Sequence, residues 1–159
     1  MEINTLLLEA SSEGNVEAVS FFISKGASVN FISSINNYTP LYAASINGHS
    51  NIVKILLANN ADIEAKVDGH TALYAAIYTE NLEIVKLLLE KNADIGVLSK
   101  DRFTPITIAS SKQSKSETCN IIYQLIIDSY RNFLKDFHKK ERPLEVVIAR
   151  CNEDLSWVK

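Results

Sequence analysis

The sequence has few of the residues that build several common kinds of protein. Two cysteines in 159 residues are too few for a disulfide framework, and neither belongs to a CxxC pair, so we expect a reducing, intracellular and cytoplasmic setting. No apolar run approaches the ~20 residues of a membrane span, and the start, residues 1–4, lacks the basic segment of a secretory signal. The net charge of −3 lacks the positive excess of a duplex binder, so no DNA partner is expected.

Patterns that carry chemistry are missing as well. None of the three histidines (His49, His70 and His138) belongs to an H-E-x-x-H motif, and the sequence has neither a G-x-S-x-G motif nor a P-loop. We therefore expect a non-enzymatic protein with no catalytic residues, no metal and no cofactor. Cys119 leaves one alternative open, an enzyme-associated role, because Lys115 and a helix start near it would favour a reactive thiolate.

What the sequence does contain is a repeat. The segments TPLYAA at 39–44, TALYAA at 71–76 and TPITIA at 104–109 begin 32 and 33 residues apart, and an apolar block follows each of them. A degenerate copy runs from Thr5 through Gly14 to Asn30. Several copies in phase indicate a repeat architecture rather than chance similarity.

Each copy has the signals of two short helices and a turn. Its threonine can accept a backbone N–H as a helix N-cap, and a proline follows it in two copies. Apolar residues at helical spacing then predict a second helix. Gly26, Asn60 and Asn92 occupy equivalent places, and all three tolerate the left-handed conformation that ends a helix. The unit is therefore expected to read helix, turn, helix, left-handed stop and a projecting β-hairpin.

The T-P-L-x-x-A motif with a period near 33 resembles the ankyrin repeat. The resemblance implies an all-α fold (an α-solenoid) and a single ankyrin-repeat domain over 1–159. Its repeats would be about 1–33, 34–66, 67–99 and 100–130, followed by a C-terminal helical cap at about 131–159. It also implies that His49 braces a turn between helices.

Apolar spacing extends the last repeat beyond the others. The place equivalent to Asn60 and Asn92 is Ser129, a poor left-handed stop, and apolar residues keep their helical spacing as far as Phe137. We predict one long helix over about 118–139, with Cys119 facing the core, and a further helix over about 143–152 that buries Leu144, Val147, Ile148 and Cys151. The polar stretch 110–116 is expected to be a surface loop.

The resemblance implies that the protein works through its concave surface of hairpins and first helices, as an adaptor, scaffold or inhibitor of a protein partner, and as a monomer. The partner-binding positions that it implies are Ile35, Tyr38, Tyr42, Ile46, Val67, His70, Tyr74, Tyr78 and Phe103. Rings precede each motif threonine, and aromatic rings are enriched among residues that dominate binding energy. The alternative is that these rings cover their own hairpins.

Charge suggests a second surface. Basic residues recur at three- and four-residue steps along the long helix, at Arg131, Lys135, His138, Lys139 and Arg142. This stripe is either the solvent-exposed face of an amphipathic helix or a docking surface for an acidic protein segment, phospholipid or RNA. The excess of lysine over arginine and the many isoleucines and asparagines are typical of AT-rich genomes, which is compatible with a factor that an intracellular bacterium or virus directs into its host.

Overall fold

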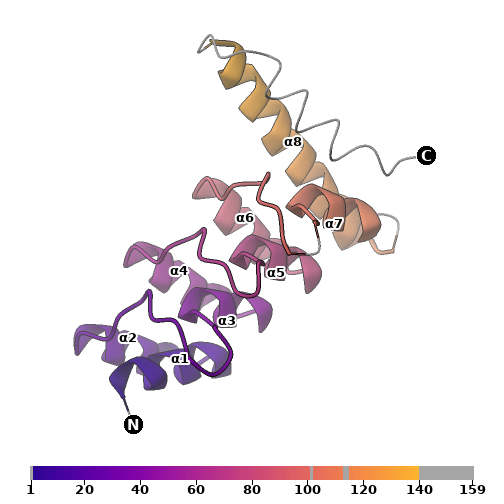
Figure 1. The fold of residues 1–159 in the computed structure, drawn as a ribbon. Coiled ribbons are helices and arrows are strands. Elements are labelled where there is room, and N and C mark those ends of the chain that lie inside the picture. The colour runs from indigo at the N-terminus through magenta and orange to yellow at the C-terminus, as the bar shows by residue number, and fades with distance from the viewer. Residues whose placement is uncertain (1, 101, 113–114, 140–159) are drawn as a thin grey trace.

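The computed structural model describes residues 2–100, 102–112 and 115–139, and of residues 133 and 135–139 it describes the backbone alone. In this part of the chain eight helices form four helix–turn–helix units: α1 Ile3–Glu13, α2 Val16–Ser24, α3 Pro40–Ile46, α4 Ser50–Ala58, α5 Ala72–Tyr78, α6 Leu82–Glu90, α7 Pro105–Lys112 and α8 Glu117–Lys139. The first helices (α1, α3, α5, α7) pack in one row and the second helices (α2, α4, α6, α8) in another (Figure 1). The expected all-α solenoid is confirmed.

The motif threonines begin the first helices as expected. The hydroxyl of Thr39 accepts the N–H of Tyr42 at 3.1 Å, and the hydroxyl of Thr71 accepts that of Tyr74 at 3.4 Å. In the last unit Thr104 and Thr107 cap each other: Thr104 accepts the N–H of Thr107 at 3.3 Å, and Thr107 accepts the N–H of Thr104 at 2.7 Å. These bonds satisfy N–H groups that a helix start otherwise leaves unpaired.

The left-handed residues that the sequence indicated follow the last residues of α2, α4 and α6 (Ser24, Ala58 and Glu90) by two positions. Gly26, Asn60 and Asn92 have φ values of 88°, 61° and 60°, the left-handed region that an asparagine or glycine adopts most easily. His49 braces the turn before α4, because its Nε2 lies 3.0 Å from the carbonyl oxygen of Ser12 in the preceding unit. Both expectations are confirmed.

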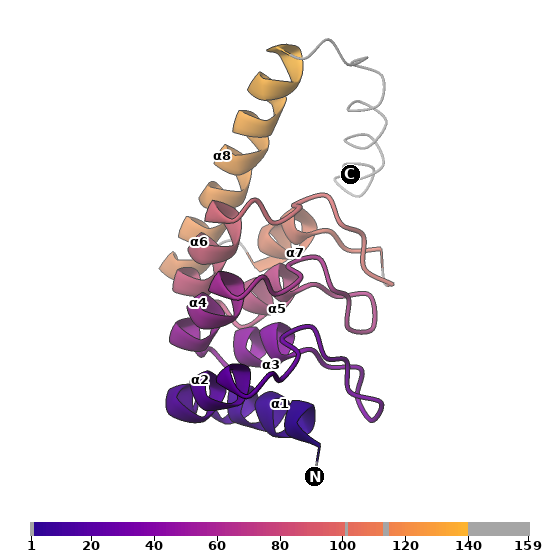
Figure 2. The ribbon, with the colours of Figure 1, turned by 90° about the vertical axis from the view of Figure 1, so that its left-hand side faces the viewer.

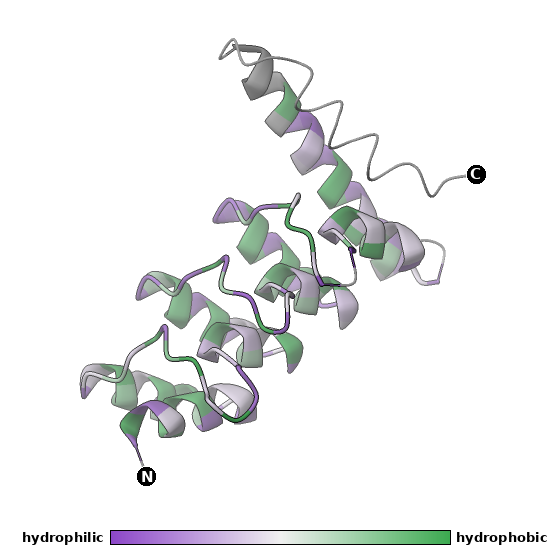
Figure 3. Cartoon of the chain, viewed as in Figure 1, coloured by the Kyte–Doolittle hydropathy of each residue, from purple (hydrophilic) through white to green (hydrophobic). Residues whose placement is uncertain are grey.

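The core lies between the two helix rows and runs along the whole stack. Small alanines let the first helices approach one another; the buried equivalents in the four units are Ala10, Ala44, Ala76 and Ala109. The second helices contribute large side chains, such as the fully buried Ile84 and Leu88. Figure 3 shows hydrophobic residues recurring in the paired helices of each unit.

The last unit confirms one expectation and corrects another. Helix α8 spans Glu117–Lys139, close to the predicted 118–139, and Cys119 is buried against the core. The polar stretch 110–116 was expected to be a loop, but its first three residues belong to α7, which ends at Lys112. The predicted helix at 143–152 lies outside the described residues. None of the helices in the described ranges has both the length and the apolar character needed to cross a bilayer.

Candidate interaction surface

Three hairpins project from the side of the first helices (Figure 2). Each is closed by an N–H that donates to the carbonyl of the residue before the next unit's threonine: Ser33 to Tyr38 at 3.0 Å, Val67 to His70 at 2.9 Å, and Ser99 to Phe103 at 2.9 Å. The turns between these ends differ in length, with residues 34–37, 68–69 and 100–102. In the second hairpin, Asp68 and Gly69 both have positive φ, as a two-residue turn between twisted strands requires.

The hairpin geometry removes Val67 from the predicted partner-binding set. Ser33, Val67 and Ser99 hold the same place in their hairpins, and all three are buried. Side chains alternate between the two faces of an extended strand, and at this place the side chain points inward. Val67 therefore packs under the surface, against Tyr42 and Ala75.

Tyr42 also lies mostly beneath the surface. Its side chain is 8% exposed, and Tyr38 packs edge-on against it with ring centroids 5.0 Å apart. Burial, with smaller contributions from Tyr38, Tyr74 and Asp68, raises the pKa of Tyr42 to about 12. Tyr42 thus packs beneath its neighbours and has little surface for a partner to contact, which corrects the expectation that Tyr42 is a partner-binding residue. Tyr38 and Ile46 are half-buried against the same cluster.

The second and third units carry a continuous set of rings. His70 lies 4.1 Å from Tyr74 between ring centroids, and Tyr74 stacks on Tyr78 at 6.5 Å with an interplanar angle of 7°. Tyr78 is 56% exposed, whereas His70 and Tyr74 are half-buried. The stack fixes the exposed ring, so that little side-chain freedom remains to be lost on binding.

The most exposed predicted positions lie at the hairpins. Ile35 in the first turn is 92% exposed, and Phe103 at the end of the third hairpin is 46% exposed. We define the ring surface as Ile35, Tyr38, Ile46, His70, Tyr74, Tyr78 and Phe103. Of the nine predicted positions, these seven keep accessible side-chain surface.

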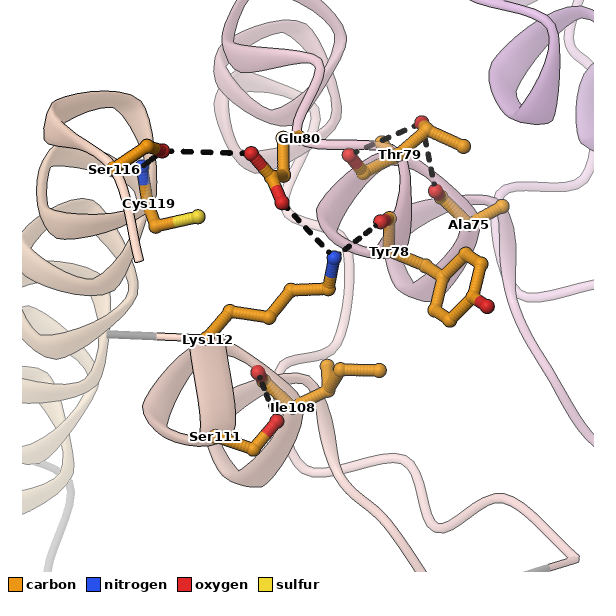
Figure 4. A network of polar contacts seen from close by, with 10 residues as sticks. Ala75, Tyr78, Thr79, Glu80, Ile108, Ser111, Lys112, Ser116 and Cys119 are labelled. Atoms are coloured by element: carbon orange, nitrogen blue, oxygen red, sulfur yellow. Dashed lines mark hydrogen bonds and ion pairs between the residues drawn. The ribbon is translucent and has the colours of Figure 1, made fainter. Parts of the chain in front are cut away.

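A polar network borders the ring surface at the last unit (Figure 4). The Lys112 ammonium donates to the carbonyl of Tyr78 at 2.7 Å and to Glu80 at 3.1 Å, and it lies 5.0 Å from the centroid of the Tyr78 ring. Ser116 donates to the second oxygen of Glu80 at 3.4 Å. The hydrogen bond from Lys112 is the main cause that lowers the pKa of Glu80. Lys112 thereby joins the exposed ring of Tyr78 to the following unit.

Comparison with known proteins agrees with this architecture. A family model described as ankyrin repeats (3 copies) matches residues 2–67 and 64–132. The chain belongs to the ankyrin-repeat family. It is similar to "Ankyrin repeat and KH domain-containing protein mask-1" of Caenorhabditis elegans, with 42% identity over 64 residues. That match covers 40% of this chain and 2% of the relative. Ankyrin repeats are generally protein–protein interaction modules without enzymatic activity.

The alternatives to partner binding by this ankyrin-repeat chain gain no support. The side chain of Cys119 is 2% exposed, so its thiol is closed to a substrate. Of the predicted basic stripe, Arg131 is exposed but pairs with Asp128 at 3.1 Å, which offsets its charge. The side chains of Lys135, His138 and Lys139, and the whole of Arg142, lie outside the described part. Within the described residues no group of three or more histidine, cysteine or carboxylate side chains is placed to hold a metal ion.

Two exposed apolar residues beside the ankyrin hairpins were missed from the sequence. Ile32 and Leu98 are 58% and 48% exposed, and each immediately precedes a buried hairpin serine. The strand alternation that turns Ser33 and Ser99 inward turns their predecessors outward. The repeat alignment places Ile32 and Leu98 at the same hairpin position. Their exposure can be inferred from it only when the serine that follows each of them is known to point inward.

Proposed function

We propose that this ankyrin-repeat chain is a non-enzymatic binding module that holds a protein partner on the ring surface, as an adaptor, scaffold or inhibitor. The observation that carries the proposal is the exposure of Ile35, Tyr78 and Phe103 on three successive hairpin-and-helix units. Burial of such exposed apolar side chains by a partner makes the free energy of binding more favourable. Folding of the units themselves leaves these three side chains largely in solvent.

The neighbouring contacts support the same proposal. Tyr74 stacks on Tyr78, and the Lys112 ammonium lies 5.0 Å from the centroid of the same Tyr78 ring. An aromatic side chain that is already fixed loses little conformational entropy on binding and presents a large contact area. The units therefore supply a surface that is ordered before the partner arrives, and binding blocks or tethers the partner without chemistry.

The test compares two alanine variants of the whole chain. In the first, Ile35, Tyr78 and Phe103 are all replaced by alanine; in the control, the exposed Phe21 of α2, which belongs to the other helix row, is replaced by alanine. We expect Phe21→Ala to retain the partners captured by the wild type and the triple variant to lose them. Aromatic side chains such as Tyr78 and Phe103 commonly contribute about 2 kcal/mol each to binding, so the combined loss should exceed a hundredfold in Kd. Equal capture by the triple variant, at an unchanged melting temperature, would overturn the proposal.

A further inference from the structure

One ring at the end of each hairpin belongs to a line that follows the repeat stack. Tyr38, His70 and Phe103 each directly precede a motif threonine, so they hold the same position in three successive units. The carbonyl of each accepts the hydrogen bond that closes its hairpin (Figure 2). This bond gives the three residues the same backbone register, whatever the length of the turn. We call these three residues the ring line.

The ring line is accessible, and two of its rings are supported by a second ring. Phe103 is 46% exposed, and Tyr38 and His70 are half-buried. Tyr38 packs edge-on against Tyr42 with centroids 5.0 Å apart, and His70 lies 4.1 Å from Tyr74. These contacts hold Tyr38 and His70 in place while part of each side chain stays open to a partner.

The charges near the ring line limit what can bind there. Neither α3 nor α5 contains a charged residue, and the first turn, 34–37, contains none either. On the other two turns, Asp68 and Lys100 pair at 3.3 Å, which offsets both charges. The remaining exposed charges on the described part of the hairpins, Lys66 and Arg102, are cations. A basic segment would be repelled, and a charge laid against the rings would lose hydration. The ring line is therefore complementary to an uncharged chain.

The spacing of the ring line favours one conformation of that chain. Helix α3 packs on α5, and α5 on α7; packed helices have axes about 8–10 Å apart, so successive rings have about this step. A polyproline II helix has three residues per turn and rises about 9.3 Å over them. An extended strand presents the same face about every 6.7 Å, and two turns of an α-helix rise about 10.8 Å. The polyproline II helix matches the step best.

Proline has the chemistry that these rings recognise. Aromatic residues form the docking surfaces of several domains that bind proline-rich segments. Such a segment is extended before it binds, so it loses little conformational entropy. Proline has no backbone N–H but keeps its carbonyl acceptor, and the hydroxyl of Tyr38 is a donor.

We propose that the ring line binds a proline-rich, uncharged segment of the protein partner in the polyproline II conformation. Its prolines are three residues apart, as in P-x-x-P-x-x-P, and one packs on each of Tyr38, His70 and Phe103. The segment runs along the stack, across the first helices. This inference rests on the proposed function, because the ring line is part of the ring surface and the segment belongs to the partner held there.

Selection from a random library of 16-residue peptides displayed on phage tests the inference without presupposing a sequence. The whole chain is used as wild type, as Phe103→Ala and as the triple variant Tyr38→Ala, His70→Ala and Phe103→Ala. Phe21→Ala, an exposed position on the other helix row, is the control. We expect the wild type and the control to enrich peptides with prolines three residues apart, and both ring-line variants to lose them. Phe103→Ala changes an exposed ring, so its result does not depend on whether the triple variant folds.

A synthetic peptide then measures the register. The most enriched peptide is compared, by fluorescence anisotropy, with a version that has one alanine inserted between its prolines. The insertion moves the following prolines out of step with the rings, so we expect about a tenfold higher Kd. Phe103→Ala should raise the Kd of the original peptide by about tenfold, because it removes one of the rings.

Three outcomes would overturn the inference. Enriched peptides that need the ring surface but lack the proline spacing would show that a chain of another conformation binds there, and would leave the proposed function standing. Equal affinity of the inserted peptide would contradict the register. A selection with no peptide that depends on the ring line would also exclude the proline-rich segment. The proposed function is decided separately, by the capture of protein partners with the variant of Ile35, Tyr78 and Phe103.

Discussion

Asn30 and Glu64 occupy the same position in successive units, and each binds the loop of the unit that follows. The amide oxygen of Asn30 accepts the N–H of Asp62 at 2.7 Å, and its amide nitrogen donates to the carbonyl of Asn60 at 3.3 Å. Glu64 repeats the first bond, accepting the N–H of Asp94 at 2.7 Å. Its other oxygen is buried and receives no hydrogen bond from the described residues. Burial raises the pKa of Glu64; the hydrogen bond from the Asp94 N–H opposes this rise, and the charges of Asp94 and Asp62 add to it.

At the residue scale we therefore predict that Glu64→Gln stabilises the protein. The amide keeps the bond to Asp94, removes a partly buried charge and supplies the donor that Asn30 has. We expect a gain of up to about 1 kcal/mol in the free energy of unfolding at neutral pH, limited by partial solvation of the group. A raised pKa means that ionisation of Glu64 destabilises the fold, so the gain is largest above the folded pKa and shrinks as the pH falls toward 4.5.

Urea unfolding of both proteins at neutral pH and near 4.5 measures this effect. The reciprocal change Asn30→Asp is the matched control, because it removes a donor and adds a charge at the equivalent place; it should destabilise at neutral pH. If the Glu64→Gln protein is no more stable than the wild type, the unpaired, buried oxygen of Glu64 does not destabilise the fold.

At the scale of elements, the end of α5 depends on the end of α7. The last carbonyls of a helix lack partners within it, and the Lys112 ammonium binds the carbonyl of Tyr78, the final residue of α5. The Lys112 side chain is 17% exposed, so this contact is largely shielded from water. Glu80, on the turn that follows α5, forms an ion pair with the same Lys112 ammonium.

We predict that Lys112→Met lowers the free energy of unfolding by about 1 kcal/mol through the lost hydrogen bond to Tyr78, and returns the pKa of Glu80 toward 4.5. A lowered carboxyl pKa stabilises the fold above its unfolded value, and that contribution is lost as the pH falls through the folded pKa. NMR titration of the Glu80 carboxyl follows the shift directly. Lys115→Met removes an exposed lysine nearby and should change neither quantity; an unaltered Glu80 titration in Lys112→Met would refute the link.

Most helices could be predicted because their signals are local. The threonine caps, the left-handed Asn60 and Asn92, and the apolar spacing of α8 depend on residues a few positions apart. The end of α7 could not be predicted, because Lys112 is held by Tyr78 and Glu80, more than thirty residues away in the sequence. The same holds for the buried Tyr42 and Val67, since their exposure depends on how the hairpin folds back over α3 and α5.

At the scale of the whole molecule, the alanines of the first helices set the distance between units. Ala10, Ala44, Ala76 and Ala109 recur at one position, and all four are buried. Since α3 packs on both α1 and α5, and α5 on both α3 and α7, each inner alanine lies in a row with neighbours on two sides. A larger side chain there has no free volume to occupy.

We predict that Ala76→Leu destabilises the protein by about 1–3 kcal/mol, because it overfills the contact between first helices. Ala58→Leu adds the same atoms at an exposed place at the end of α4 and should change stability by less than about 0.5 kcal/mol. Urea unfolding of the two variants beside the wild type measures the difference. Equal stability of the two variants would mean that the alanine row does not limit the spacing of the units.

The unequal hairpins have a consequence for recognition. Their turns contain residues 34–37, 68–69 and 100–102, so four, two and three residues connect the paired ends of the three hairpins. A polypeptide bound across all three would meet turns of unequal length, and turning it end for end would place its side chains against different turns. We predict that this difference in loop length would favour one of the two directions in which a bound chain could run.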